Sequence, residues 1–467
     1  MEFFESSDDH KEILNKVTRF ESMVANKENY YFDCEEFQDI IEYYILRSDF
    51  DKAKEVVEYS LNLHPTSVDL KLLKTQVLVG FFKYKEALSL VEEIELYEPL
   101  NVDLLLIKGT VLSKLKMSDR AIACFKRCID HSEYIDEVYH FIASEYQRIQ
   151  EYEEAIRYFK LCLQANPENE VALYELNMCF ECTKNHKEAI QFYTKLVDEA
   201  PYCESIWFNL AGAYSRVENW LKAVDCYDYA LAINPQFASA YFNKANALAS
   251  YGDFKSAIEV YEESFEHEDP TFITYSYVGE CYERLKNYDK GIFYYKKAIS
   301  ENEDYPEAWL GVAICQDGLG HSNEAYASIT KALELDKENP DFWYTASEIE
   351  ERLGYIDDSV VSMKKAVSLD ETDLSLALDY LMLLERHFDF SIVEEALANT
   401  IDKFTNNSAL LYFKTAFLLK QGIYQQAYQC FELALNMDYK SHERVFNYYP
   451  DAKLNQNLLE LIDLYRD

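Results

Sequence analysis

The stretch ESIWFNLAGAYSRVENWLKAVDCYDYALAINPQF, residues 204–237, decides the fold of this chain. Its apolar residues recur three or four positions apart, which is the spacing of one face of an α-helix. Two such faces follow one another: Trp207, Leu210, Ala211 and Tyr214 in the first, and Ala223, Tyr227 and Ala230 in the second. Pro235 cannot continue the second helix. The stretch therefore predicts two short helices joined by a turn.

The same pattern returns along the chain with a period of 34 residues. The position of Ala223 needs a small side chain, because two helix backbones approach closely there, and stepping by the period gives Ala53, Ala87, Ala121, Ala155, Ala189, Ala257, Gly291, Ala325, Ser359, Val393 and Ala427. The position of Tyr227 is always apolar or aromatic: Val57, Val91, Phe125, Phe159, Tyr193, Tyr261, Tyr295, Ile329, Met363, Leu397 and Phe431. Twelve repeats therefore run from residue 34 to residue 441 without an insertion.

The order of large and small residues resembles the tetratricopeptide repeat, whose signature is W-x2-L-G-x2-Y, then A-x3-F, then a closing Pro, at the same period. The resemblance implies an all-α, right-handed superhelical solenoid of helix-turn-helix repeats. We expect an N-terminal capping helix in residues 1–33, twelve repeats in residues 34–441, and a partial repeat with a capping helix in residues 442–467. Caps are expected because the outermost repeats would otherwise expose an apolar face.

Both caps and one repeat carry more specific expectations. Residues 8–27 predict an amphipathic helix with Ile13, Val17, Phe20 and Val24 on its apolar face. At the other end, the last core is expected to be covered by Leu454, Leu458, Leu461 and Ile462. Repeat eleven replaces both small positions, with Leu381 and Val393, which predicts looser packing or a local bend.

The net charge of the chain limits the kinds of partner that it can bind. The chain has 84 acidic and 45 basic residues and a net charge of −39. Nucleic acids and anionic membranes require neutralising Lys and Arg, so both are disfavoured as partners. Basic protein segments are favoured instead. We expect a monomer, and a cytoplasmic one, since the N-terminus lacks the features of a secretory signal and the eleven cysteines are an odd number placed inside predicted helices.

Signatures of catalysis are absent from the sequence: there is no glycine-rich phosphate loop and no H-E-x-x-H motif. Cys179 and Cys182, with His186 nearby, form the one pattern that invites a metal interpretation. A lone CxxC inside a helix has no second pair of ligands, so structural thiols are favoured. We therefore expect no enzyme activity in this chain, no cofactor and no metal.

In the tetratricopeptide repeat family, the first helices line a concave groove, and their second, fifth, ninth and twelfth positions contact the ligand. Applied to repeats five to seven, this implies an aromatic and amide zone with Tyr174, Met178, Phe208, Gly212, Phe242 and Asn246. Asn209 and Asn243 resemble two rungs of the asparagine ladder with which the repeat domain of O-GlcNAc transferase holds a peptide backbone. These side chains either form a pocket for a partner or close against a neighbouring helix.

Repeats eight to eleven carry acids in the same groove. Their twelfth positions are acidic and two further glutamates join them, which gives Glu280, Glu283, Asp317, Glu348, Glu351 and Glu385. Acids in mid-helix gain little from the helix dipole, so they either attract a Lys/Arg-rich segment or form a solvated face. The leading interpretation is a non-enzymatic adaptor, scaffold or chaperone-like protein that binds a basic or extended segment of a protein partner in the groove. The alternative is a regulatory or substrate-recognition subunit whose catalysis lies on another chain.

Overall fold

The computed structural model describes residues 7–26 and 28–466, and within them the chain is all helical, with no strand. The α-helices are α1 (Ser7–Asn26), α2 (Cys34–Leu46), α3 (Phe50–Leu63), α4 (Val68–Gly80), α5 (Tyr84–Glu95), α6 (Val102–Lys114), α7 (Ser118–Cys128), α8 (Ile135–Arg148), α9 (Tyr152–Ala165), α10 (Glu170–Thr183), α11 (His186–Glu199), α12 (Glu204–Arg216), α13 (Trp220–Ile233), α14 (Ala238–Tyr251), α15 (Phe254–Ser264), α16 (Phe272–Arg284), α17 (Tyr288–Glu301), α18 (Pro306–Gly318), α19 (Ser322–Leu335), α20 (Pro340–Leu353), α21 (Ile356–Leu369), α22 (Leu374–His387), α23 (Phe390–Lys403), α24 (Ser408–Lys420), α25 (Tyr424–Asp438), α26 (Arg444–Tyr448) and α27 (Gln456–Leu464). Short 3-10 turns η1 (Tyr439–Ser441) and η2 (Pro450–Leu454) flank α26.

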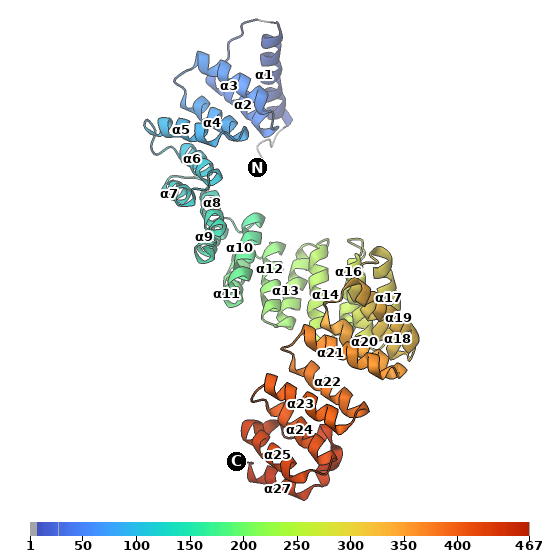
Figure 1. Cartoon of the computed structure of the whole chain (residues 1–467). Helices are drawn as coiled ribbons and strands as arrows, with labels where there is room; N and C mark the ends of the chain where they lie inside the picture. Colours follow the sequence, from blue (N-terminus) through green and yellow to red (C-terminus); the bar gives the residue numbers. More distant parts are fainter. Residues whose placement is uncertain (1–6, 27, 467) are drawn as a thin grey trace. The chain divides into compact units, whose positions relative to one another are not determined.

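The chain divides into two compact units, Met1–Tyr251 and Gly252–Asp467. Within each unit, helices that follow one another in the sequence pack as antiparallel neighbours, from α2 to α14 in the first unit and from α15 to α25 in the second (Figure 1). The division falls at the turn between α14 and α15. The all-α repeat array predicted from the sequence is confirmed.

The small and large signature positions show why the helices pair in this register. The position of Ala223 is buried in all twelve repeats, and so is the position of Tyr227, where no side chain is more than 4% exposed. At Gly291, an added Cβ would lie 2.9 Å from the sulfur of Cys315, so a larger residue there would require that side chain to shift. The large side chains fill space beside small residues of the first helices, since an added Cβ at Gly109 would meet the ring of Phe125, and one at Gly279 or Gly311 the ring of Tyr295. Filling space in this way is how close-packed interiors avoid voids.

The turn between the paired helices is built the same way almost everywhere. Its central residue has the left-handed backbone conformation, with a φ of 55–97°, in eleven repeats: Ser48, Phe82, Lys116, Gln150, Lys184, Glu218, Gly252, Lys286, Gly320, Gly354 and Gly422. Repeat eleven is the exception, since Phe388 has an extended backbone with φ −127°. The departure that the sequence predicts for this repeat therefore lies in its turn, while Leu381 and Val393 are both buried.

Tryptophan ties first helices to the loops before them. The indole nitrogens of Trp207, Trp309 and Trp343 each donate a hydrogen bond of 2.9 Å to a backbone carbonyl six residues earlier. A half-buried indole N–H needs such a partner, because leaving it unpaired costs free energy. The repeated contact sets the angle at which the chain enters each of these helices.

The N-terminal cap packs through Val17, Phe20 and Met23, which are all at most 3% exposed. The ring of Phe20 meets Phe32 edge to face at 5.8 Å. Val24, expected on this face, is 43% exposed. Met23 takes its place because the longer thioether reaches the hydroxyl of Tyr59, with the sulfur 3.8 Å from the oxygen. Residue 27, the expected end of the helix, lies outside the described residues.

The C-terminal cap is α26, η2 and α27. Leu458 is fully buried against the last core, and Leu461 and Ile462 are partly buried, as predicted. Leu454 is 85% exposed, so the prediction for this residue is wrong. Leu454 is the last residue of the 3-10 turn before α27, so it does not lie on the buried face of that helix. Ala452, in the same turn, is 1% exposed.

Candidate functional site

An ion-pair ladder links successive first helices. The acid at the twelfth helix position meets a cation 35 residues later, at the thirteenth position of the next first helix: Glu181 with Arg216 at 2.9 Å, Asp317 with Arg352, Glu351 with Arg386 at 2.9 Å, and Glu385 with Lys420 at 2.7 Å. Three of the acids proposed as a groove stripe are therefore rungs of this ladder. Their negative charge is matched within the chain.

Glu283 and Glu280 stand outside the ladder. The residue 35 positions after Glu283 is Gly318, so this rung of the ladder has no cation, and Glu283 accepts a hydrogen bond of 2.8 Å from the hydroxyl of Tyr295. Burial raises the pKa of the Glu283 carboxyl. Glu280 pairs with Arg284 of its own helix at 3.4 Å.

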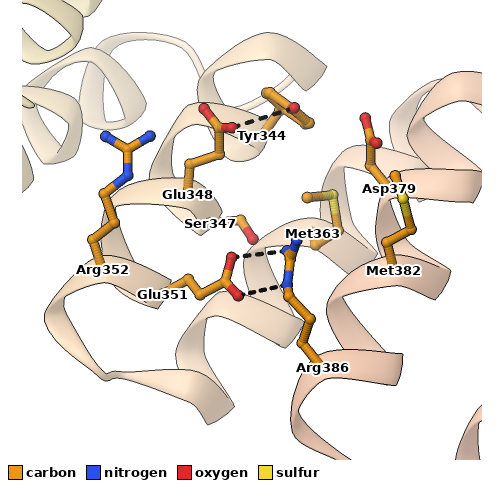
Figure 2. Close-up of a pocket in the computed structure, with 9 residues that line it drawn as sticks. All are labelled: Tyr344, Ser347, Glu348, Glu351, Arg352, Met363, Asp379, Met382 and Arg386. Carbon is orange, nitrogen blue, oxygen red and sulfur yellow. Dashed lines mark hydrogen bonds and ion pairs between the residues drawn. The ribbon is translucent and has the colours of Figure 1, made fainter. Parts of the chain in front are cut away.

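A pocket of about 150 Å³ opens between α20, α21 and α22 (Figure 2). Glu351 and Arg386 form one wall with two contacts, and the Tyr344 hydroxyl donates a hydrogen bond of 3.4 Å to Glu348 on another wall. The lining residues are Tyr344, Ser347, Glu348, Glu351, Arg352, Met363, Asp379, Met382 and Arg386. Helices α20 and α22 are the first helices of repeats ten and eleven, and α21 is the second helix of repeat ten. The pocket therefore lies on the face of the first helices, which also carries the ion-pair ladder.

The charged forms of two carboxyl groups in this pocket, those of Glu348 and Asp379, are disfavoured. Burial raises the pKa of Glu348, and the charges of Asp379 and Glu351 raise it further, against the opposing effects of Tyr344 and Arg386. Burial also raises the pKa of Asp379, again against Arg386. The pKa of Tyr344 rises to about 12, first through burial and then through both acids. Arg386 forms its ion pair with Glu351, and its charge does not cancel the effect of burial on Glu348 and Asp379. An added cation would therefore stabilise both carboxylates.

Sequence reasoning found Glu348 and missed Asp379. Asp379 occupies the sixth position of its helix, and the family pattern draws attention to the second, fifth, ninth and twelfth positions. Only the packing of α22 beside α20 brings the two carboxyls to one pocket. The signal in the sequence that could have indicated Asp379 is an acidic residue directly after the fifth position of the first helix, in the repeat that follows the one with Glu348.

The aromatic zone of the first unit separates into open and closed parts. Tyr174 is 66% exposed and Met178 42%, and together with Val171 at 58% they form an apolar stripe along one face of α10. An added Cβ on Gly212, in the next first helix, would meet nothing within 4 Å. The surface beside the stripe is therefore open at that point.

Phe208 belongs to the closed part, because its ring packs on Phe237 at 4.9 Å and on Tyr227 at 5.7 Å. Phe242 and Asn246 are half-buried. The side-chain amides of Asn209 and Asn243 donate to carbonyls of their own helices, at 2.7 and 2.8 Å. In this structure both amides are thus used within the helix that carries them.

The cysteines offer no cluster of ligands. All eleven are free, Cys179 is buried and Cys182 is exposed. Burial raises the pKa of the Cys179 thiol to about 12, which disfavours the thiolate that binds metals. No group of three or more His, Cys, Asp or Glu side chains that could hold a metal occurs among residues 7–26 and 28–466. In the same residues, no helix is long and apolar enough to cross a membrane.

A buried carboxyl on the other side of α20 gives a pH prediction. Glu350 is 6% exposed, one of its oxygens has no hydrogen-bond partner among the described residues, and burial raises its pKa. Since the folded state then binds the proton more tightly, this group favours folding below its unfolded pKa and that contribution is lost as pH rises through the folded pKa. The Glu350→Gln variant should therefore be more stable than the wild type at pH 7, by about 1 kcal/mol or more.

Glutamine suits this position, because Gln316 occupies it one repeat earlier and accepts a hydrogen bond of 2.7 Å from Ser328. Urea denaturation at a series of pH values tests the prediction, with the exposed Glu338→Gln as the control. The stability difference should close below about pH 4, where the unfolded carboxyl is protonated too. A difference that stays constant across this range would contradict the burial argument.

Comparison with known proteins supports the repeat assignment. Two tetratricopeptide repeat models match the chain, one at residues 102–131, 136–169, 278–305 and 340–373, and the other at residues 208–271. A comparison with curated proteins found no significant sequence match.

Several solved structures share the helical repeat. A tetratricopeptide repeat protein from Parabacteroides merdae is 18% identical, with 53% of this chain and 98% of that one covered and a TM-score of 0.43. The Cut9–Hcn1 hetero-tetramer of APC/C gives 14% identity, 84% and 89% coverage and a TM-score of 0.41. YrrB, described as a tetratricopeptide repeat protein with an unusual peptide-binding site, gives 22% identity, 40% and 96% coverage and a TM-score of 0.33.

Proposed function

Because this chain is a tetratricopeptide repeat protein, a fold that generally serves as a scaffold for protein–protein interaction, we propose that its particular task is to hold a basic, extended segment of a partner protein on its first-helix face. The chain acts as a non-enzymatic adaptor. The pocket between α20, α21 and α22 takes one cationic side chain of that segment.

The observation that carries the proposal is the pair Glu348 and Asp379. Their pKa values are raised by burial, and the two arginines that line the same pocket are paired with other acids, Arg386 with Glu351 and Arg352 with Asp317. A Lys or Arg side chain entering the pocket would restore the stability of both charged carboxylates. The volume of about 150 Å³ suits the end of one side chain, since pockets for cofactors and drug-sized ligands span roughly 300–1,000 Å³.

The remaining contacts are those expected for an extended segment. In the first unit, the stripe of Val171, Tyr174 and Met178 offers apolar area that is exposed in the described part of the chain. Exposed apolar patches of this kind usually mark interaction sites. The net charge of −39 draws a basic segment toward either unit and speeds its encounter.

The test uses synthetic 15-residue peptides of equal apolar content whose net charges differ in sign, with binding measured by fluorescence anisotropy. Lysine- and arginine-containing peptides should bind the full chain most tightly. The double variant Glu348→Gln with Asp379→Asn should weaken that binding at least tenfold, which corresponds to about 1.4 kcal/mol. Because neutralising these two half-buried acids removes like-charge repulsion, the variant should fold normally.

The matched control is Glu394→Gln with Glu395→Gln on α23, where both residues are exposed. It removes the same charge from the same unit and should change the affinity far less. Equal losses in both variants would mean that only the overall charge attracts the peptides, and unchanged binding in both would rule out the pocket as the site.

A further inference from the structure

The loop between α5 and α6 exposes its apolar side chains to solvent. Residues 96–101 read LYEPLN, and Leu96, Tyr97 and Leu100 are 80%, 76% and 61% exposed. Exposed apolar residues that occur singly need no explanation, but three in one short loop form a patch.

Polar side chains hold this loop from the inside. The carboxylate of Glu95 accepts from Lys108 at 2.5 Å and from Arg127 at 2.7 Å, and Arg127 also donates to the carbonyl of Pro99 at 2.7 Å. Asn101 donates to Glu98 at 2.8 Å and caps α6 by accepting from the backbone of Leu104 at 3.0 Å. The loop is therefore fixed in a shape that presents its apolar side chains outward, and little ordering entropy remains to be lost on binding.

In two corresponding loops an aromatic residue packs on the protein itself, whereas Tyr134 and Tyr202, in two others, are exposed singly. Phe237, between α13 and α14, packs on Phe208 at 4.9 Å, and Tyr305, between α17 and α18, packs on Phe272 at 5.0 Å. Covering the protein's own core is thus a common use of an aromatic residue at this place. The loop after α5 has no such use for Leu96, Tyr97 and Leu100.

Charge around the loop indicates the occupant. The nearby cations are paired with acids inside the chain, Lys108 and Arg127 with Glu95 and Arg120 with Glu92. Glu98 in the loop itself and Asp103 at the start of α6 form no ion pair with any residue in the described part of the chain. The patch therefore carries a surplus of negative charge at its rim.

We propose that the loop after α5 is a docking site for a protein surface with an apolar hollow rimmed by Lys or Arg. Leu96, Tyr97 and Leu100 enter the hollow, and the acids around them meet the basic rim. Anionic membranes and nucleic acids are repelled by this rim. A second copy of the chain, with its own charge of −39, is repelled as well. The site lies in the first unit and is independent of the pocket at α20–α22.

The experiment selects 12-residue peptides from a random phage-displayed library on the full chain and measures their affinities as synthetic peptides. We expect a class of peptides that combines large apolar residues with Lys or Arg. This class should lose at least tenfold in affinity on the L96S/Y97S/L100S variant. It should keep its affinity on the control Y202S/L454S/L464S, which removes one tyrosine and two leucines of equal or greater exposure elsewhere.

Three results would overturn the proposal. The first is that the selected peptides do not distinguish the two variants, which places their site elsewhere. The second is that the peptides whose affinity falls on the loop variant contain apolar residues but no Lys or Arg, which would show that the partner needs no basic rim. The third is a wild-type dimer in sedimentation velocity that the loop variant abolishes, because the occupant is then a second copy. Binding at the pocket of α20–α22 is unaffected in all three cases, so it is judged separately.

Discussion

Replacing Ala223 with leucine is expected to lower the free energy of unfolding by roughly 1–3 kcal/mol or more, the usual range for overpacking a core. Ala223 is fully buried at the small position of α13, where the facing helix leaves room for a methyl group only. A leucine there must move a helix or adopt an unfavourable rotamer. Urea denaturation followed by circular dichroism measures the loss.

The control for this variant lies on the same helix. Ala232 is exposed near the end of α13, so Ala232→Leu adds the same atoms at a position where they extend into solvent. Since each repeat packs only on its neighbours, hydrogen exchange should accelerate first in α12, α13 and α14. An Ala223→Leu variant with the unfolding curve of the wild type would mean that the repeat register is wrong at this position.

The second large effect is expected at the C-terminal cap. Leu458 is the one residue of α27 that is fully buried, so Leu458→Ala should cost roughly 2–5 kcal/mol, as truncation of a buried leucine does. The observed loss is limited by the free energy with which α27 detaches by itself, because a detached helix loses nothing more. Hydrogen exchange of α25 and α27 measures both quantities.

Leu454→Ala is the matched control, since it makes the same change four residues earlier at a side chain that is 85% exposed. It should leave exchange rates near those of the wild type. Equal effects of the two changes would show that α27 is held by something other than Leu458. Faster exchange in α25 for the Leu458 variant alone supports the assignment of α27 as a cap over the last core.

The repeat register could be predicted from the sequence because its constraints are local and recur. A small residue at the position of Ala223 and a large one at that of Tyr227 are needed in each repeat, so each repeat tests the pattern again. The ends of the array lack this repetition. There the prediction chose Val24 and Leu454, and the structure buries Met23 and Ala452 instead. A shift of one or two residues cannot be detected where no neighbouring repeat checks it.

The candidate site was predictable only in part, because it depends on which side chains meet across repeats. Three acids of the ladder, Asp317, Glu351 and Glu385, were predicted as groove residues, but their partners Arg352, Arg386 and Lys420 were not, because these contacts form between successive repeats. The pocket needs Asp379 beside Glu348, and that contact follows from the packing of α22 on α20. Likewise, nothing in the sequence indicates that Phe208 turns toward Phe237.

The ion-pair ladder has a consequence for how such a gene can change its length. Each acid of the ladder faces a cation 35 residues ahead, one position beyond the 34-residue period. Excision of residues 340–373, one whole repeat, would bring Arg386 to the same place relative to Asp317 that Arg352 holds now. Duplication of the same segment would likewise add one acid and one cation that match. Recombination between repeats can therefore shorten or extend this part of the array without leaving a rung unpaired.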